Sequence, residues 1–205
     1  MSKDERARRG SEPGRQSALL ITDVQNDFCA SGALPVPDCE RILPALNRHL
    51  SDAQARGLPI YASRDWHPEK TVHFKAHGGE WPPHCVQDSA GAEFHPALKL
   101  PPDTVVISKG DDPAEHGYSS FEGHTPEGKA FLDELHARGI DHLYVSGIAT
   151  DYCVRATVLD ALESGVRVTL LTDAIAGIDA KPGDVDRAMD EMRKHGADVA
   201  DAVAP

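Results

Sequence analysis

A continuous apolar run near the start of the chain constrains the fold most strongly. Residues 18–22 read Ala-Leu-Leu-Ile-Thr and are followed directly by Asp23. A run of this kind, without polar alternation, is typical of a parallel strand that is buried on both faces of a sheet. Asp23 is therefore expected at the carboxyl end of a central strand.

Strand-like and helix-like segments alternate along the rest of the chain. Strand patterns lie at residues 58–63, 104–108, 142–147, 166–172 and 198–200, and helical patterns at residues 39–56, 126–139, 153–165 and about 182–195. Asp38 can cap the first of these helices, and Thr125 followed by Pro126 is the pattern of a helix start. The alternation predicts an α/β fold, a three-layer α/β/α sandwich around a central, mainly parallel sheet of about six strands.

The composition favours a globular protein that acts on a small molecule. Residues 1–17 contain little apolar surface, so we expect a flexible tail ahead of a single domain over residues 18–205. The net charge of −12 argues against nucleic acid and acidic membrane surfaces as partners. No apolar run approaches the ~20 residues that span a bilayer, and residues 1–10 lack the apolar core of a secretion signal. A cytoplasmic location is therefore expected.

The cysteines show no pairing pattern. They are far apart in the sequence and form no CxxC motif; their positions are Cys29, Cys39, Cys85 and Cys153. Neither a disulfide framework nor a zinc knuckle is indicated by this spacing. The sequence predicts four reduced thiols.

Three reactive side chains follow different predicted strands. Asp23, Lys109 and Cys153 each stand at the carboxyl end of a strand, the edge at which parallel sheets bind ligands. A cysteine nucleophile needs a base and a positive neighbour, and a helix N-terminus is expected to lower the thiol pKa from ~8.5. Each residue alone also fits a structural role, as a core thiol, a turn cap or a solvated strand end. Their convergence favours a catalytic trio.

A long segment between residues 64 and 102 has no regular periodicity and is rich in histidine. Its candidate metal ligands are Asp65, His67, His73 and His84. One carboxylate and three imidazoles suit a divalent transition metal such as zinc, iron(II) or manganese, with positions left open for water or substrate. A solvated polar loop is the alternative, and His77 and His95 compete as ligands.

Five separated motifs stand out along the chain: Asp23–Phe28, Ser63–Pro68, Trp81–Cys85, Ser108–Gly110 and Gly147–Val154. Together they resemble the nicotinamidases, also called pyrazinamidases, of the isochorismatase-like hydrolases. The resemblance covers about residues 18–200 and keeps the motifs in order. This resemblance implies hydrolysis of nicotinamide to nicotinate and ammonia through a thioester, a place in NAD salvage, and action on pyrazinamide.

The resemblance also implies roles for single residues. Cys153 matches the nucleophile, Asp23 the acid–base residue and Lys109 the third member of the triad. A single divalent metal, held by Asp65, His67, His73 and His84, would position the pyridine nitrogen of the substrate.

The resemblance also implies which residues of this chain form the substrate pocket. Phe28, Trp81 and Tyr118 match positions around the substrate ring. The bond between Ile148 and Ala149 matches a cis peptide, which would direct the N–H groups of Ala149 and Cys153 at the oxyanion. Tyr152 departs from the family, since many nicotinamidases have histidine there, and this change bears on substrate selectivity.

The sequence is also compatible with two other functions. The chain could be another cysteine amidohydrolase or a vinyl-ether hydrolase of the isochorismatase type. It could also be a catalytically silent protein that binds a metal or ligand on the same fold. Both a monomer and a homo-oligomer are compatible with the sequence.

Overall fold

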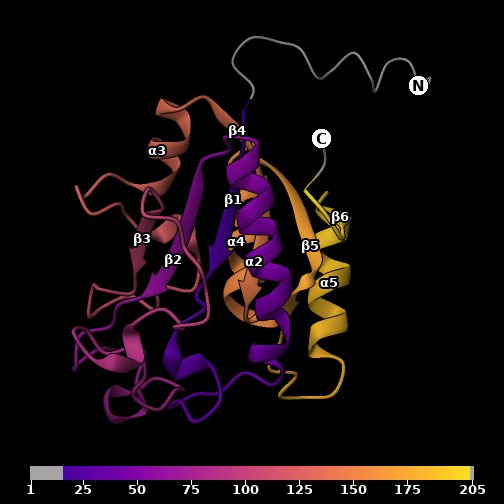
Figure 1. Ribbon diagram of the computed structural model, residues 1–205. Helices are drawn as coiled ribbons and strands as arrows, with labels where there is room; N and C mark the ends of the chain where they lie inside the picture. Colours follow the sequence, from indigo (N-terminus) through magenta and orange to yellow (C-terminus); the bar gives the residue numbers. More distant parts are fainter. Residues whose placement is uncertain (1–15, 204–205) are drawn as a thin grey trace.

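Six parallel strands form the central layer of the protein (Figure 1). The computed structural model describes residues 16–203 of the chain. The strands are β1 (Gln16–Thr22), β2 (Ile60–Asp65), β3 (Val105–Lys109), β4 (Ile140–Ile148), β5 (Arg167–Ala176) and β6 (Asp198–Ala200). Their order is β3-β2-β1-β4-β5-β6, and every neighbouring pair is parallel. The predicted sheet is confirmed.

Strand β1 lies inside the sheet, as its apolar run predicts. Leu19 and Ile21 belong to the apolar core on one face, and Leu20 belongs to the core on the other face. Side chains alternate between the faces of a strand, so a strand covered on both sides must be apolar throughout. All three side chains are fully buried.

The helices are α2 (Cys39–Ala55), α3 (Phe131–Ala137), α4 (Arg155–Glu163) and α5 (Asp184–Lys194). Helix α2 packs on one face through residues that include Leu46 and Leu50. The other face is covered by α3, α4 and α5, through residues that include Leu135, Val158 and Met192. Figure 1 shows α2 crossing in front of the sheet. The predicted three-layer sandwich is confirmed.

Two helix starts differ from the prediction. The expected helix at 126–139 begins only at Phe131, because residues 125–130 form a tight turn. In this turn Thr125 O accepts a hydrogen bond from Gly128 N, and Thr125 N donates to Lys129 O. These bonds occupy the backbone groups that a helix start would use. Asp38 precedes α2 as expected, but its side chain makes no capping hydrogen bond.

The start of the domain also lies earlier than expected. Strand β1 already includes residues 16 and 17, which the sequence placed in the flexible tail. The remaining part of that expected tail, residues 1–15, lies outside the described residues. Among residues 16–203, no helix is long and apolar enough to cross a membrane.

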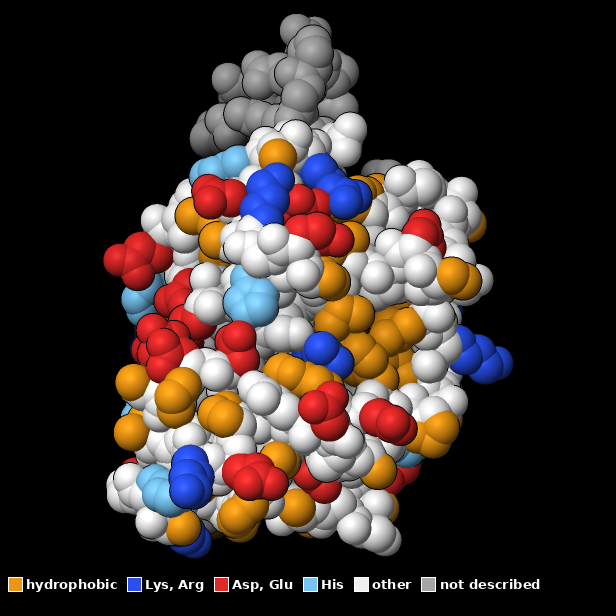
Figure 2. All heavy atoms as spheres, turned by 90° about the vertical axis from the view of Figure 1, so that its left-hand side faces the viewer, with side chains coloured by type: hydrophobic (Ala, Val, Ile, Leu, Met, Phe, Trp, Pro, Cys, Tyr) orange, Lys and Arg blue, Asp and Glu red, His pale blue; other side chains and the backbone are white. Residues whose placement is uncertain are grey.

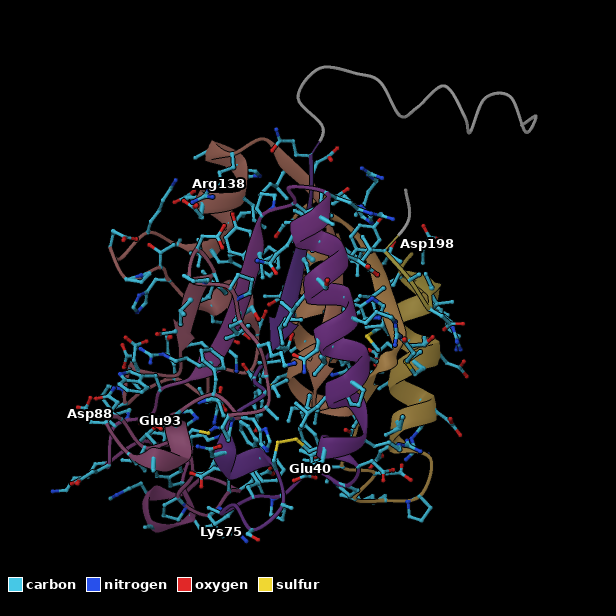
Figure 3. The ribbon with its side chains drawn as sticks, viewed as in Figure 1. Glu40, Lys75, Asp88, Glu93, Arg138 and Asp198 are labelled. Atoms are coloured by element: carbon cyan, nitrogen blue, oxygen red, sulfur yellow. A yellow bond between two sulfur atoms is a disulfide. The ribbon has the colours of Figure 1, made fainter. Side chains whose placement is uncertain are left out.

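A disulfide joins Cys29 to Cys39, with their Cα atoms 5.3 Å apart. The prediction of four reduced thiols is therefore wrong for this pair, whereas Cys85 and Cys153 are free and buried. The ten-residue loop folds back on the start of α2, where the labelled Glu40 lies beside the bond (Figure 3). Glu40 accepts a hydrogen bond from Ala30 N at 2.6 Å, which holds the loop in this arrangement. Spacing along the sequence does not reveal such a contact.

His142 predicts an acid-sensitive contribution to stability. Its ring lies between the hydroxyls of Ser17 and Thr169, each 2.9 Å away, and burial lowers its pKa from 6.5 to about 4. The unfolded chain therefore binds a proton at higher pH than the folded chain. Stability should fall as the pH drops from 6.5 to 4, by about 1.4 kcal/mol per pH unit. Above pH 6.5 the ring is neutral in both states and contributes no pH dependence.

His142→Gln should remove this dependence, because the amide does not titrate. The measurement is the free energy of urea unfolding of both proteins between pH 7 and pH 4. Parallel pH curves for the two proteins would contradict the prediction.

Candidate active site

The predicted catalytic trio meets at the carboxyl edge of the sheet. Asp23 directly follows β1, Lys109 ends β3, and Cys153 follows β4. Lys109 Nζ lies 2.7 Å from Asp23 Oδ2 and 3.6 Å from Cys153 Sγ. The strand order reverses between β1 and β4, which makes this the topological switch point at which such sheets bind ligands. Asp23 and Cys153 lie on either side of it.

A short π-helical turn, Thr150–Val154, presents Cys153. The nucleophile candidate therefore precedes α4, which begins at Arg155, whereas the sequence placed it in the first turn of that helix. Ahead of this turn, the peptide bond between Ile148 and Ala149 is cis. Gly147 has a φ of 107°, and a Cβ there would lie 2.1 Å from the carbonyl oxygen of Thr22. Glycine is required because β4 and β1 approach so closely at this point.

The charges around Lys109 are strongly coupled. Its ammonium is fully buried and pairs with the carboxylates of both Asp23 and Asp65. Burial opposes the charge of Lys109, but the two carboxylates outweigh burial and raise its pKa well above the usual value. Gly117 O accepts a further hydrogen bond from Nζ at 2.9 Å. The site therefore holds a permanent cation between two acids.

The same acids that favour the charged form of Lys109 favour the uncharged form of the thiol. Burial, together with the negative charges of Asp23 and Asp65, raises the pKa of Cys153 well above its usual value, although Lys109 counteracts them. Burial likewise raises the pKa of Asp23. The expected lowering of the thiol pKa by a helix end is therefore wrong. Burial and the two acids therefore favour the protonated form of the thiol.

Three of the four predicted metal ligands form one buried cluster. One nitrogen atom from each of His67, His73 and His84 lies within 4.8 Å of the others. Asp65 Oδ2 completes the set, 3.5 Å from His67 Nε2 and 3.7 Å from His84 Nε2. The competing candidates lie elsewhere, because His77 is exposed and His95 neighbours Cys29 and Glu40.

The donor set of this cluster fits a divalent cation. The Nδ1 atoms of His67 and His84 lie 2.9 and 2.8 Å from the carbonyl oxygens of Gly110 and Pro82. Each Nδ1 therefore carries the proton, which leaves the Nε2 lone pair free. His67 Nε2 is buried and has no hydrogen-bond partner. Burial lowers the pKa of His73 to about 3, which favours the neutral ring that coordination requires.

Aromatic and apolar side chains enclose a pocket next to Cys153. Trp81 Nε1 donates a hydrogen bond to Tyr118 Oη at 2.8 Å, and the rings of Trp81 and Tyr152 meet edge to face at 5.1 Å. The residues predicted to bind the substrate all line this pocket, and so do both residues of the cis peptide; they are Phe28, Trp81, Tyr118 and Tyr152, with Ile148 and Ala149. The pocket also borders Asp65, His73 and His84, so Cys153 and two of the clustered histidines line the same cavity.

Several site residues were not predicted from the sequence. Leu34, Val36 and Ile178 form apolar parts of the pocket wall. Leu34 and Val36 could have been found from the sequence, because they form an apolar pair within a loop rich in Gly and Pro. Ser63 donates a hydrogen bond to Asp23 Oδ1 at 2.7 Å. Its position near the end of β2, beside the end of β1, was the signal in that case.

Fold and site together define a class of hydrolases. The model of the isochorismatase domain family matches residues 17–203, and the chain belongs to this family. It is 42% identical to the nicotinamidase of Escherichia coli, over 88% of this chain and 92% of that protein. It is 40% identical to the nicotinamidase/pyrazinamidase of Mycobacterium tuberculosis, over 86% of this chain and 94% of that protein.

Solved structures show the same similarity. The pyrazinamidase of Pyrococcus horikoshii in complex with zinc matches with a TM-score of 0.83 and 44% identity, covering 90% of this chain and 98% of that one. PnC1 from L. infantum in complex with nicotinate matches with a TM-score of 0.77 and 32% identity, covering 95% of this chain and 98% of that one. The resemblance read from the five motifs is confirmed.

Proposed function

We propose that this protein hydrolyses nicotinamide to nicotinate and ammonia. The observation that carries the proposal is the single pocket in which Cys153, a buried histidine cluster and a wall of aromatic rings meet. Similarity to nicotinamidases over nearly the whole chain supports the substrate. The expected place in NAD salvage and the cytoplasmic location remain predictions.

The first half of the reaction forms a thioester. Asp23 accepts the proton of Cys153, and the sulfur attacks the carboxamide carbon. The N–H groups of Ala149 and Cys153 would stabilise the resulting oxyanion. Asp23 then returns the proton to the amide nitrogen as the carbon–nitrogen bond breaks, so ammonia leaves. A base beside the sulfur is essential because burial keeps the thiol protonated at rest.

The second half releases the acid. Asp23 takes a proton from water while the water oxygen attacks the thioester carbon, and the carbon–sulfur bond breaks. The proton then returns to Cys153, and the product leaves as nicotinate after its carboxyl group gives the second proton of the water to the solvent. Throughout both halves Lys109 stays protonated, because two carboxylates surround it, and it balances the negative charge that moves between Asp23 and the sulfur.

We further propose that Asp65, His67, His73 and His84 hold one divalent metal, with zinc, iron(II) or manganese as candidates. When bound, such an ion supplies a Lewis-acid contact for the ring nitrogen of the substrate. Phe28, Trp81 and Tyr118 would enclose the flat ring, which also suits pyrazinamide. Tyr152 would tune which ring substituents fit, because its ring packs against Trp81 at the pocket wall.

Removal of the metal tests the proposed site. Dialysis against a chelator, or His67→Ala, should raise the KM for nicotinamide at least about tenfold, because substrate orientation is lost. Ammonia release from nicotinamide and the metal content of the protein are the measurements. His77→Ala is the matched control, since His77 is an exposed histidine of the same loop. Unchanged KM after both treatments would refute the metal site.

Substrate choice separates the proposed activity from its relatives. Nicotinamide should be hydrolysed in preference to isochorismate and carbamoylated amines. The same protein sample is assayed with each compound. Faster hydrolysis of isochorismate or of a carbamoylated amine would show that nicotinamide is not the preferred substrate. The assignment of the nucleophile would not be affected.

A further inference from the structure

Gln25 is a fully buried amide whose hydrogen bonds all go to backbone groups. Its Nε2 donates to Asp65 O at 2.8 Å and to Ala92 O at 2.9 Å. Its Oε1 accepts a hydrogen bond from Asp65 N at 2.8 Å. Both the N–H and the C=O of Asp65 are therefore bonded to one side chain. The proposed reaction uses Gln25 in no chemical step.

Asp65 is the residue through which such a contact can affect the site. One carboxylate oxygen pairs with Lys109, and the other faces the Nε2 atoms of His67 and His84. A single carboxylate therefore lies between the catalytic cation and the histidine cluster. Both sets of contacts depend on the position of the Asp65 backbone, because the short aspartate side chain has little freedom to compensate for a backbone shift.

We infer that Gln25 is a positioning residue of the metal centre, which it serves by holding the backbone of Asp65. This inference rests on the proposed metal site. Two contacts of 2.8 Å fix the backbone of residue 65, and the contact with Ala92 anchors the amide to the loop beyond the pocket. Groups that support a metal ligand in this way typically change metal affinity 10–100-fold when removed.

Gln25→Met tests the inference, because it keeps the length of the side chain and removes its hydrogen bonds. The probe is Zn²⁺ alone, titrated into metal-free protein in competition with a coloured chelator. We expect zinc to bind about 10–100-fold more weakly to the variant. Thermal unfolding is measured on each sample to show that it is folded. Gln25→Glu, which loses both N–H donors, replaces the first variant if that one does not fold.

Asn26→Ala is the matched control. Asn26 neighbours Gln25 and donates a hydrogen bond to Ala90 O at 2.8 Å, so it supports the same turn without touching Asp65. Its zinc affinity should stay within about twofold of the starting protein.

A double-mutant cycle distinguishes positioning from general destabilisation. In an Asp65→Ala background, Gln25 has no ligand to position, so adding Gln25→Met should change zinc affinity by less than about twofold. An equal loss in both backgrounds would overturn the inference, as would unchanged affinity in the single variant. If the starting protein binds no zinc, both the proposed metal site and this inference are refuted. If zinc binds equally well with and without Gln25, only the inference is refuted.

Discussion

Cys153→Ala is expected to lower the rate of nicotinamide hydrolysis by about four orders of magnitude or more. The variant lacks the atom that forms the thioester, and no other free thiol of the described residues lies in the pocket. Its fold should persist, because alanine keeps the Cβ and removes only the buried sulfur. Ammonia release measures activity, and circular dichroism with thermal unfolding measures the fold.

Cys85→Ala is the control for this variant. Cys85 is also a free, buried cysteine, but it does not line the pocket. Its replacement should leave the turnover rate nearly unchanged. A mass increase that corresponds to a nicotinoyl group on Cys153, found after rapid quenching, would support the thioester directly. Substantial ammonia release by Cys153→Ala would show that the nucleophile is a different group.

Lys109→Met is expected to destabilise the fold by about 3–5 kcal/mol and to abolish activity. The change removes the buried ammonium that pairs with both Asp23 and Asp65, and leaves two buried carboxylates close to each other. Like charges in a buried site repel strongly, so one carboxylate must take up a proton or the structure must open. The free energy of urea unfolding at pH 7 is the measurement.

Lys129→Met provides the comparison for a lysine at the surface. Lys129 Nζ lies 3.1 Å from Glu134 Oε2, with the lysine side chain 38% exposed. Solvent screens this pair, so its loss should cost about 1 kcal/mol or less and leave activity intact. Equal destabilisation by the two lysine variants would mean that the buried network contributes no more than a surface ion pair.

The raised pKa of Cys153 changes how the chemistry of this site is understood. A preformed thiolate could attack the substrate without first giving a proton to Asp23. Because burial and two acids favour the protonated thiol, the proposed reaction needs Asp23 to take up the proton as the sulfur attacks. The fixed charge of Lys109 then compensates for the thiolate that forms. The proposed reaction therefore depends on all three residues.

The surface of the protein is consistent with a small-molecule substrate. On the face shown in Figure 2, Lys and Arg side chains are interspersed with acidic ones and form no continuous basic surface. The net charge of −12 agrees with this distribution. That nucleic acid and membranes are not partners stays a prediction, and so does the oligomeric state.

The sequence by itself determined the fold class and the edge at which the site forms. Apolar runs that end in Asp23 and Lys109 are local signals, because a strand buried on both faces must be apolar wherever it lies. Parallel strands bring their carboxyl ends to one edge, so the meeting of these residues with Cys153 followed from order alone. The ligand set could be proposed because histidines are concentrated in one irregular loop.

Tertiary structure decided everything that depends on contacts between distant segments. It joined Cys29 to Cys39, started α3 at Phe131 after a turn, and brought Ile178 to the pocket. It also placed Asp65 between Lys109 and the histidines, and buried Cys153 deeply enough to raise its pKa. Charge coupling and burial arise from three-dimensional packing and leave no local pattern in the chain, so the raised pKa of Cys153 could not be predicted from the sequence.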